Sequence, residues 1–167
     1  MKRFMQVLAA VAVLAVLCSC SFRLRGLDQT SVTAKYSSIF LRGDRSSVLY
    51  EELYARLMTL GLPMVDQEQE GTVIVAFAGP EFRKSLVAVD SRSQDVEYSL
   101  SCRTVFYFID SAIPETERHP ARRTSGHTRN YFNKNDEVLA SNNEADLLEQ
   151  SLIRQTAEDI YIQFLRQ

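Results

Sequence analysis

The residues best suited to chemistry in this sequence are its three cysteines and two histidines. Cys18 and Cys20 lie two positions apart near the N-terminus, whereas His119 and His127 follow roughly a hundred residues later. A structural zinc site needs four ligands, which usually come as two closely spaced pairs. Because no second pair with that spacing accompanies the two cysteines, we predict neither a metal site nor a cofactor.

The segment before Cys20 has the pattern of an export signal. Lys2 and Arg3 supply positive charge, and the 14 residues from Phe4 to Leu17 carry none. This run is shorter than the roughly 20 apolar residues that a membrane-spanning helix needs, but it matches the apolar part of a signal peptide.

The sequence Leu-Cys-Ser-Cys at 17–20 then resembles a bacterial lipobox, in which the last cysteine is acylated and becomes the new N-terminus. We therefore predict a signal peptide over 1–19 and lipidation of Cys20, which would attach the chain to a membrane.

Composition narrows the class of protein further. Without the two cations of the signal peptide, the chain has 17 basic and 21 acidic residues. A generic nucleic-acid binder is expected to be basic, so we predict no nucleic-acid partner. The length after residue 19 suits one domain with a substantial core.

Evidence for catalysis is weak. Cys102 is the only thiol left after Cys20, and a single cysteine cannot form an intramolecular disulfide. The sequence has no Gly-x-Ser-x-Gly elbow and no glycine-rich phosphate loop. We predict no catalytic residue, although an anchored enzyme that uses Cys102 remains a competing hypothesis.

Basic residues form two groups that could contact an anion, since guanidinium pairs well with phosphate. Arg83, Lys84 and Arg92 form the smaller group. The larger group falls in a polar connection and the strand after it, and consists of Arg118, His119, Arg122, Arg123, His127 and Arg129, of which the four arginines are the candidate anion contacts. The alternative interpretation is a solvated loop without a binding role. If the two groups lie at neighbouring turns of a sheet, they would make one positive edge.

Two amphipathic helices are predicted to position these residues. The first runs from Ser47 to Leu60, with leucines at steps of four and three residues and Gly61 as its C-terminal cap. The second has about 22 residues, begins at the Ser-x-x-Glu capping box of Ser141 and continues to the end of the chain.

Strands are predicted between and before these helices, at Ser38–Arg42, Thr72–Phe77, Phe82–Val89, Val96–Ile109 and Arg123–Asn133. Gly79-Pro80 separates Thr72–Phe77 from Phe82–Val89, so these two runs form either two strands or one long bent strand. Alternation in the long fourth strand directs Cys102 inward and Arg103 outward. We predict an α+β domain over 38–167, in which an antiparallel sheet of about four strands carries both helices on one face, preceded by a tether over 20–37.

Three segments resemble the LptE family of lipopolysaccharide-assembly lipoproteins. The segment CSFRLRG at 20–26 is similar to the family's opening motif, and VEYSLSCRTVF at 96–106 is similar to its Glu-Tyr-containing strand. The segment from Arg129 to Leu165 resembles the family's last strand, helix cap and helix.

The resemblance implies a non-enzymatic outer-membrane lipoprotein that lies in the lumen of the LptD β-barrel, helps it fold and contacts lipopolysaccharide. Ser21 is compatible with transport to the outer membrane. Arg92 best matches the family's basic turn residue, and Arg83 or Lys84 would assist it, whereas Ser141 replaces a second basic residue. A lipoprotein that binds lipids or other ligands in the periplasm without a barrel remains the alternative.

Overall fold

The computed structural model describes residues 29–89, 95–134 and 138–167. The predicted signal peptide, Cys20 and Arg92 lie outside the described residues. In chain order the main elements are α2 (Gln29–Lys35), β1 (Ser38–Arg42), α3 (Val48–Met58), β2 (Met64–Val65), β3 (Thr72–Phe77), β4 (Glu81–Val89), β5 (Asp95–Asp110), β6 (Arg123–Lys134) and α4 (Val138–Leu165). A short 3-10 turn, Glu115–Glu117, lies between β5 and β6.

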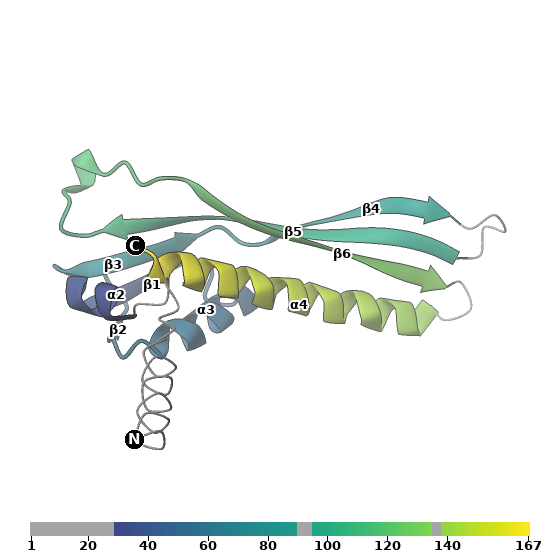
Figure 1. Cartoon of the computed structure of the whole chain (residues 1–167), viewed down its shortest axis with the longest axis horizontal. Helices are drawn as coiled ribbons and strands as arrows, with labels where there is room; N and C mark the ends of the chain where they lie inside the picture. Colours follow the sequence, from purple (N-terminus) through teal and green to yellow (C-terminus); the bar gives the residue numbers. More distant parts are fainter. Residues whose placement is uncertain (1–28, 90–94, 135–137) are drawn as a thin grey trace, which may run out of the picture.

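The strands form one twisted, mostly antiparallel sheet, and α3 and α4 pack against the same face of it (Figure 1). This confirms the predicted fold class. We call the face turned away from α4 the open face.

Strands β3 and β4 pair with the same edge of β5, so together they act as one bent strand. Phe77 of β3 is opposite Phe106, and Glu81 of β4 is opposite Arg103. β6 pairs with the other edge of β5 over Asp95–Phe106. We call β4, β6 and residues 95–105 of β5 the distal half of the sheet, and the remainder the proximal half.

The expectation of a purely antiparallel sheet needs one correction. β1 runs parallel to β3 and to the two-residue strand β2. The reason is connectivity: α3 carries the chain from β1 back across the sheet before the neighbouring strands begin, and a crossover of this kind produces parallel neighbours.

The first predicted helix is confirmed, and the second begins earlier than predicted. Ser47 is the N-cap of α3, where its hydroxyl accepts a hydrogen bond of 3.2 Å from the Tyr50 backbone N–H, and Gly61 has a φ of 75°. α4 spans 28 residues from Val138, so Ser141 lies inside the helix. Leu139 and Ala140 are strong helix formers, and their propensity outweighs the capping signal.

The buried residues form two clusters. The larger lies under the proximal half and includes Leu49, Leu53, Val73, Phe106 and Phe164. The smaller lies under the distal half and consists of Leu100, Cys102, Tyr131 and Leu152. α4 spans both clusters along the length of the sheet (Figure 1).

α2 falls within the predicted tether, yet it belongs to the folded domain. Val32 is 1% exposed and Tyr36 is 6% exposed, and both join the larger cluster. Of the α2 residues whose burial is described, 32–35, only Val32 is buried, and one buried side chain gives little periodicity, which explains why the sequence showed no helical signal there.

Candidate functional site

The distal half of the sheet has two chemically different faces. On the side of α4, Asp159 Oδ2 accepts a hydrogen bond of 3.1 Å from Ser125 Oγ and lies 2.7 Å from His127 Nε2. Cys102 Sγ is 3.8 Å from Thr156 Oγ1. These contacts fasten α4 to β5 and β6.

This group of Ser, His and Asp does not have the geometry of a hydrolase. A nucleophilic triad places histidine between the hydroxyl and the carboxylate, whereas here Asp159 lies between Ser125 and His127. The Cys102 thiol is 1% exposed, and burial raises its pKa. A protonated, inaccessible thiol is a poor nucleophile, so the geometry gives no support to an enzyme that uses Cys102.

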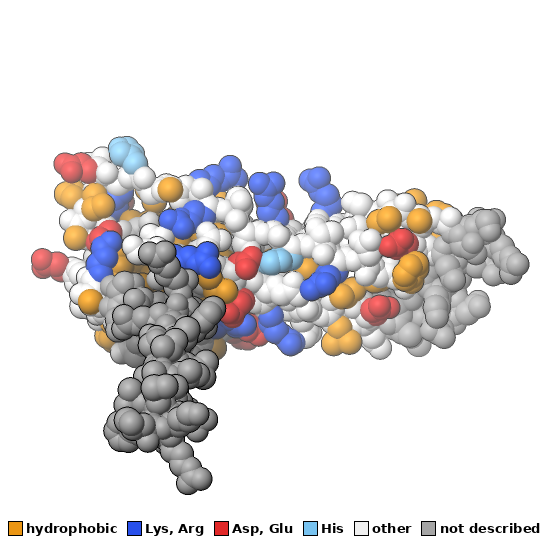
Figure 2. Space-filling model, viewed as in Figure 1, with side chains coloured by type: hydrophobic (Ala, Val, Ile, Leu, Met, Phe, Trp, Pro, Cys, Tyr) orange, Lys and Arg blue, Asp and Glu red, His pale blue; other side chains and the backbone are white. Residues whose placement is uncertain are grey.

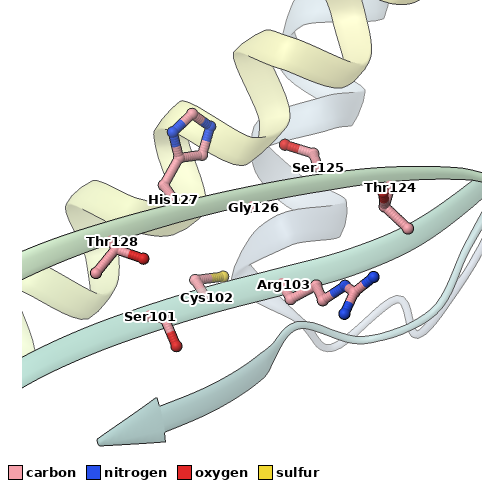
Figure 3. A pocket seen from close by; sticks show the side chains of 8 residues that line it. All are labelled: Ser101, Cys102, Arg103, Thr124, Ser125, Gly126, His127 and Thr128. Atoms are coloured by element: carbon pink, nitrogen blue, oxygen red, sulfur yellow. The ribbon is translucent and has the colours of Figure 1, made fainter. Parts of the chain in front are cut away.

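On the open face, polar side chains surround a glycine. Arg103 is opposite Gly126 across the strands, and Ser101 is opposite Thr128. Figure 3 shows Ser101 and Arg103 directed away from α4, whereas Ser125 and His127 point toward it. A shallow hollow of about 310 Å³ lies among these residues, together with Thr124. It can take hydroxyl-rich or anionic groups.

Arg103 also lines two neighbouring hollows. One, of about 270 Å³, is shared with Glu81 and Arg83, and the other, of about 100 Å³, is shared with Glu81 and Arg122. Among the described residues, the guanidinium groups of Arg83, Arg103 and Arg122 have no ion pair or hydrogen bond. Figure 2 shows basic side chains projecting along the side of the sheet opposite α4. We call Arg83, Arg103 and Arg122 the open-face arginines.

The other predicted anion contacts do not join this group. Lys84 is opposite Leu100 on the helix side, where its Nζ lies 4.0 Å from the centre of the Tyr98 ring. Arg123 lies over the ring of Phe108 at 5.1 Å. Arg118 is in an ion pair with Glu68. Of the described members of the two sequence groups, only Arg83 and Arg122 lie on the open face, so these described members do not form one continuous edge.

Arg129 is opposite Leu100 on the helix side of β6, and Arg92 lies outside the described residues. Arg103 was not among the predicted site residues. Its outward position was predicted from alternation, but its lack of an acidic partner depends on tertiary contacts. The signal that could have found it is that Arg103 is the single cation on the outward-facing side of the long fourth strand, next to Ser99 and Ser101.

The end of the distal half exposes apolar side chains. Val89, the last residue of β4, is 49% exposed, and Phe132 on β6 is 58% exposed. Leu86 and Leu147 are 59% and 65% exposed. In the sequence, Arg92 follows Val89 by three residues and lies outside the described residues.

Within the described ranges, no group of three or more Cys, His, Asp or Glu side chains could hold a metal ion. No helix in that part of the chain combines the length and apolarity needed to cross a membrane.

Solved structures with the same fold are bacterial lipoproteins. Rare lipoprotein B from Shewanella oneidensis matches with a TM-score of 0.64 and 18% identity, covering 74% of this chain and 89% of that one. A minor lipoprotein from Acinetobacter baumannii gives 0.60 and 18%, with coverage of 78% and 91%. Lipoprotein B from Nitrosomonas europaea gives 0.55 and 13%, with coverage of 77% and 81%. No curated protein matches the chain.

The chain thus shares its fold with several small bacterial lipoproteins. The family model for lipopolysaccharide assembly matches residues 23–164, which is most of the chain. The chain therefore belongs to the LptE family. The family consists of non-enzymatic lipoproteins that take part in lipopolysaccharide assembly at the outer membrane.

Proposed function

We propose that this lipoprotein lies in the lumen of the LptD β-barrel, assists its assembly and contacts lipopolysaccharide on its way to the outer leaflet. The observation that carries the proposal is the polar open face of the distal half, with Ser101, Arg103, Thr124 and Thr128 exposed or half-buried. The interior of a large outer-membrane barrel is polar, so such a face suits a protein enclosed by a barrel wall.

The proposed lipid anchor fits this placement. An acylated Cys20 would hold the chain at the membrane, and one acyl chain alone binds only marginally. Bacterial lipoproteins carry three chains, so we expect stable attachment. The domain could then enter the barrel lumen from the periplasmic side.

The experiment that tests the barrel partner is a pull-down of tagged full-length protein from native envelopes in gentle detergent. We expect a partner in one-to-one ratio whose gel mobility changes on heating, as a stable β-barrel does. Elution of the lipoprotein alone would contradict the plug and favour the alternative, a periplasmic lipid-binding lipoprotein that works without a barrel.

We further propose that lipopolysaccharide meets the distal end of the sheet. Arg92 falls in the sequence between β4 and β5, three residues after exposed Val89, and Phe132 on β6 is also exposed at this end of the sheet. Lipopolysaccharide combines phosphates with acyl chains, so a cation beside apolar side chains matches both of its parts. Arg83 lies six residues before Val89, about 20 Å along the strand, and would reach a more distant phosphate. Lys84 would contribute from the helix side.

Arg92→Ala is expected to weaken lipopolysaccharide binding about tenfold or more, because a hydrogen bond to a charged group contributes about 1.5–3 kcal/mol. Binding of purified lipopolysaccharide to the full chain checks this. Arg166→Ala is the matched control, because it removes an exposed cation just after the C-terminal end of α4, away from the distal end of the sheet. We expect this variant to bind lipopolysaccharide as the wild type does. Equal affinity of Arg92→Ala and wild type would refute the contact.

A further inference from the structure

β4 is an exposed edge strand. All nine of its residues, Glu81–Val89, are exposed. Among the described residues, β4 pairs only with β5. In an antiparallel edge strand, every second residue directs its N–H and C=O away from the neighbouring strand. About four residues of β4 therefore offer these groups to solvent.

The edge is open because β1 stops short of it. β1 pairs with β3 from Ser38 to Arg42, and the chain then turns away at Gly43. A Cβ atom at Gly43 would lie only 2.3 Å from Phe77 Cζ, so the backbone crosses closely over that ring. Because β3 and β4 pair with the same edge of β5, a strand added to β4 would lie in line with β1, as the next strand of the sheet.

We propose that the edge of β4 pairs with an extended segment of another polypeptide that alternates acidic and apolar side chains. This mode of recognition uses backbone hydrogen bonds for affinity and alternate side chains for specificity. The inference goes beyond lipopolysaccharide assembly and does not rest on the proposed lipid contact.

The positive charge near β4 is the reason that we expect acidic side chains at every second position of the partner segment. An added strand would place every second side chain on the open face, beside Arg83 and close to Arg103. Most other basic side chains of the described residues already have acidic partners: Lys35, Arg42, Arg45, Arg56, Arg118 and Arg154. Glu81 is the only acid on β4. Glu81 lies on the open face opposite Arg103, so one carboxylate faces three arginines and net positive charge remains next to the edge.

Exposed apolar side chains on the helix side of β4 are the reason that we expect apolar residues at the remaining positions of the partner segment. Phe82 is opposite buried Cys102, and Leu86 is opposite Tyr98. Leu86 is nevertheless 59% exposed and Phe82 is 36% exposed. A neighbouring strand with apolar residues on this side would cover both side chains.

A second copy of this chain is a poor occupant. Antiparallel pairing of two β4 strands about Ser85 would bring two copies of Arg83 and Lys84 to one edge, without enough acids to balance them. Charged residues on edge strands commonly prevent such self-pairing. The same charges favour an acidic strand, so they discriminate between partners.

The test uses the full-length protein in detergent and a synthetic peptide, Thr-Glu-Val-Glu-Ile-Glu-Thr, in the absence of lipopolysaccharide. We expect the peptide to slow hydrogen exchange of the outward-facing β4 amides about tenfold, because bonded amides exchange only after opening. A peptide with the same sequence but N-methylated at alternate residues keeps its charge and cannot form the ladder. Equal protection by both peptides would overturn edge pairing.

Charge reversal tests the role of the arginines. The double variant Arg83→Glu and Arg103→Glu is expected to lose affinity for the acidic peptide and to bind a peptide with Lys in place of Glu. Arg166→Glu makes the same kind of change at the far end of α4 and is expected to keep the wild-type preference. Unchanged preference in the double variant would overturn the proposed charge matching. Binding of the Lys peptide by the double variant would show that this variant is folded and would support the proposed charge matching.

Discussion

Replacement of Phe106 by alanine is expected to lower the free energy of unfolding by about 3–5 kcal/mol, the range for a large buried aromatic side chain. Phe106 is 0% exposed. It is opposite Phe77 of β3 on one edge of β5 and opposite Arg123 of β6 on the other. Its ring centre lies 5.4 Å from that of Phe108. Its loss would leave a cavity where the two halves of the sheet meet.

Urea denaturation followed by circular dichroism measures this change. Phe132→Ala removes the same side chain from a site that is 58% exposed, and its effect is expected to stay within about 0.5 kcal/mol. Similar losses in the two variants would show that Phe106 does not have the packing role that its burial indicates.

Local patterns in the sequence predicted most elements because these elements depend on local chemistry. Alternation over Val96–Ile109 identified β5, and the leucine spacing with the Ser47 cap identified α3. The β-rich run Thr72–Phe77 coincides with β3. In each case the residues that define the element are also those that it buries.

Features that depend on distant contacts could not be predicted in the same way. The parallel pairing of β1 with β3 joins residues 34 positions apart, such as Ile39 and Val73. The pairing of Arg118 with Glu68 spans 50 positions. Sequence alone placed Arg118 with the other cations as a candidate anion contact, because its acidic partner lies in a different part of the chain.

The candidate site shows the same division. Alternation predicted that Arg103 faces outward with Ser101, and the register confirms that they share the open face. Which cations remain unpaired is decided by every acidic side chain that can reach them. The distinction between Arg83 on the open face and Lys84 over Tyr98 follows from strand pairing and the placement of α4.

The distal half depends on a small core, and this makes one leucine important. Leu152→Ala is expected to cost about 2–5 kcal/mol, the range for leucine in a buried site. Leu152 is 0% exposed and belongs to the cluster of Leu100, Cys102 and Tyr131. With so few buried residues, no neighbouring side chain can compensate for the lost contacts.

Hydrogen exchange shows where the stability is lost. We expect the amides of β6 and of α4 before Leu152 to exchange much faster in Leu152→Ala, while β1 and β3, which lie over the larger cluster, change less. Leu147→Ala is the matched control, since it removes the same side chain from the same helix at a site that is 65% exposed. Leu147→Ala is expected to leave exchange unchanged.

Uniform loss of protection in Leu152→Ala would show that the two halves unfold together and would contradict this division. Selective loss would mean that the distal half can open while the proximal half stays folded. The distal half carries the β4 edge, two of the open-face arginines and the exposed apolar side chains at its end. Partner binding there would then stabilise the part of the domain that has the least core of its own, because a ligand stabilises the state to which it binds.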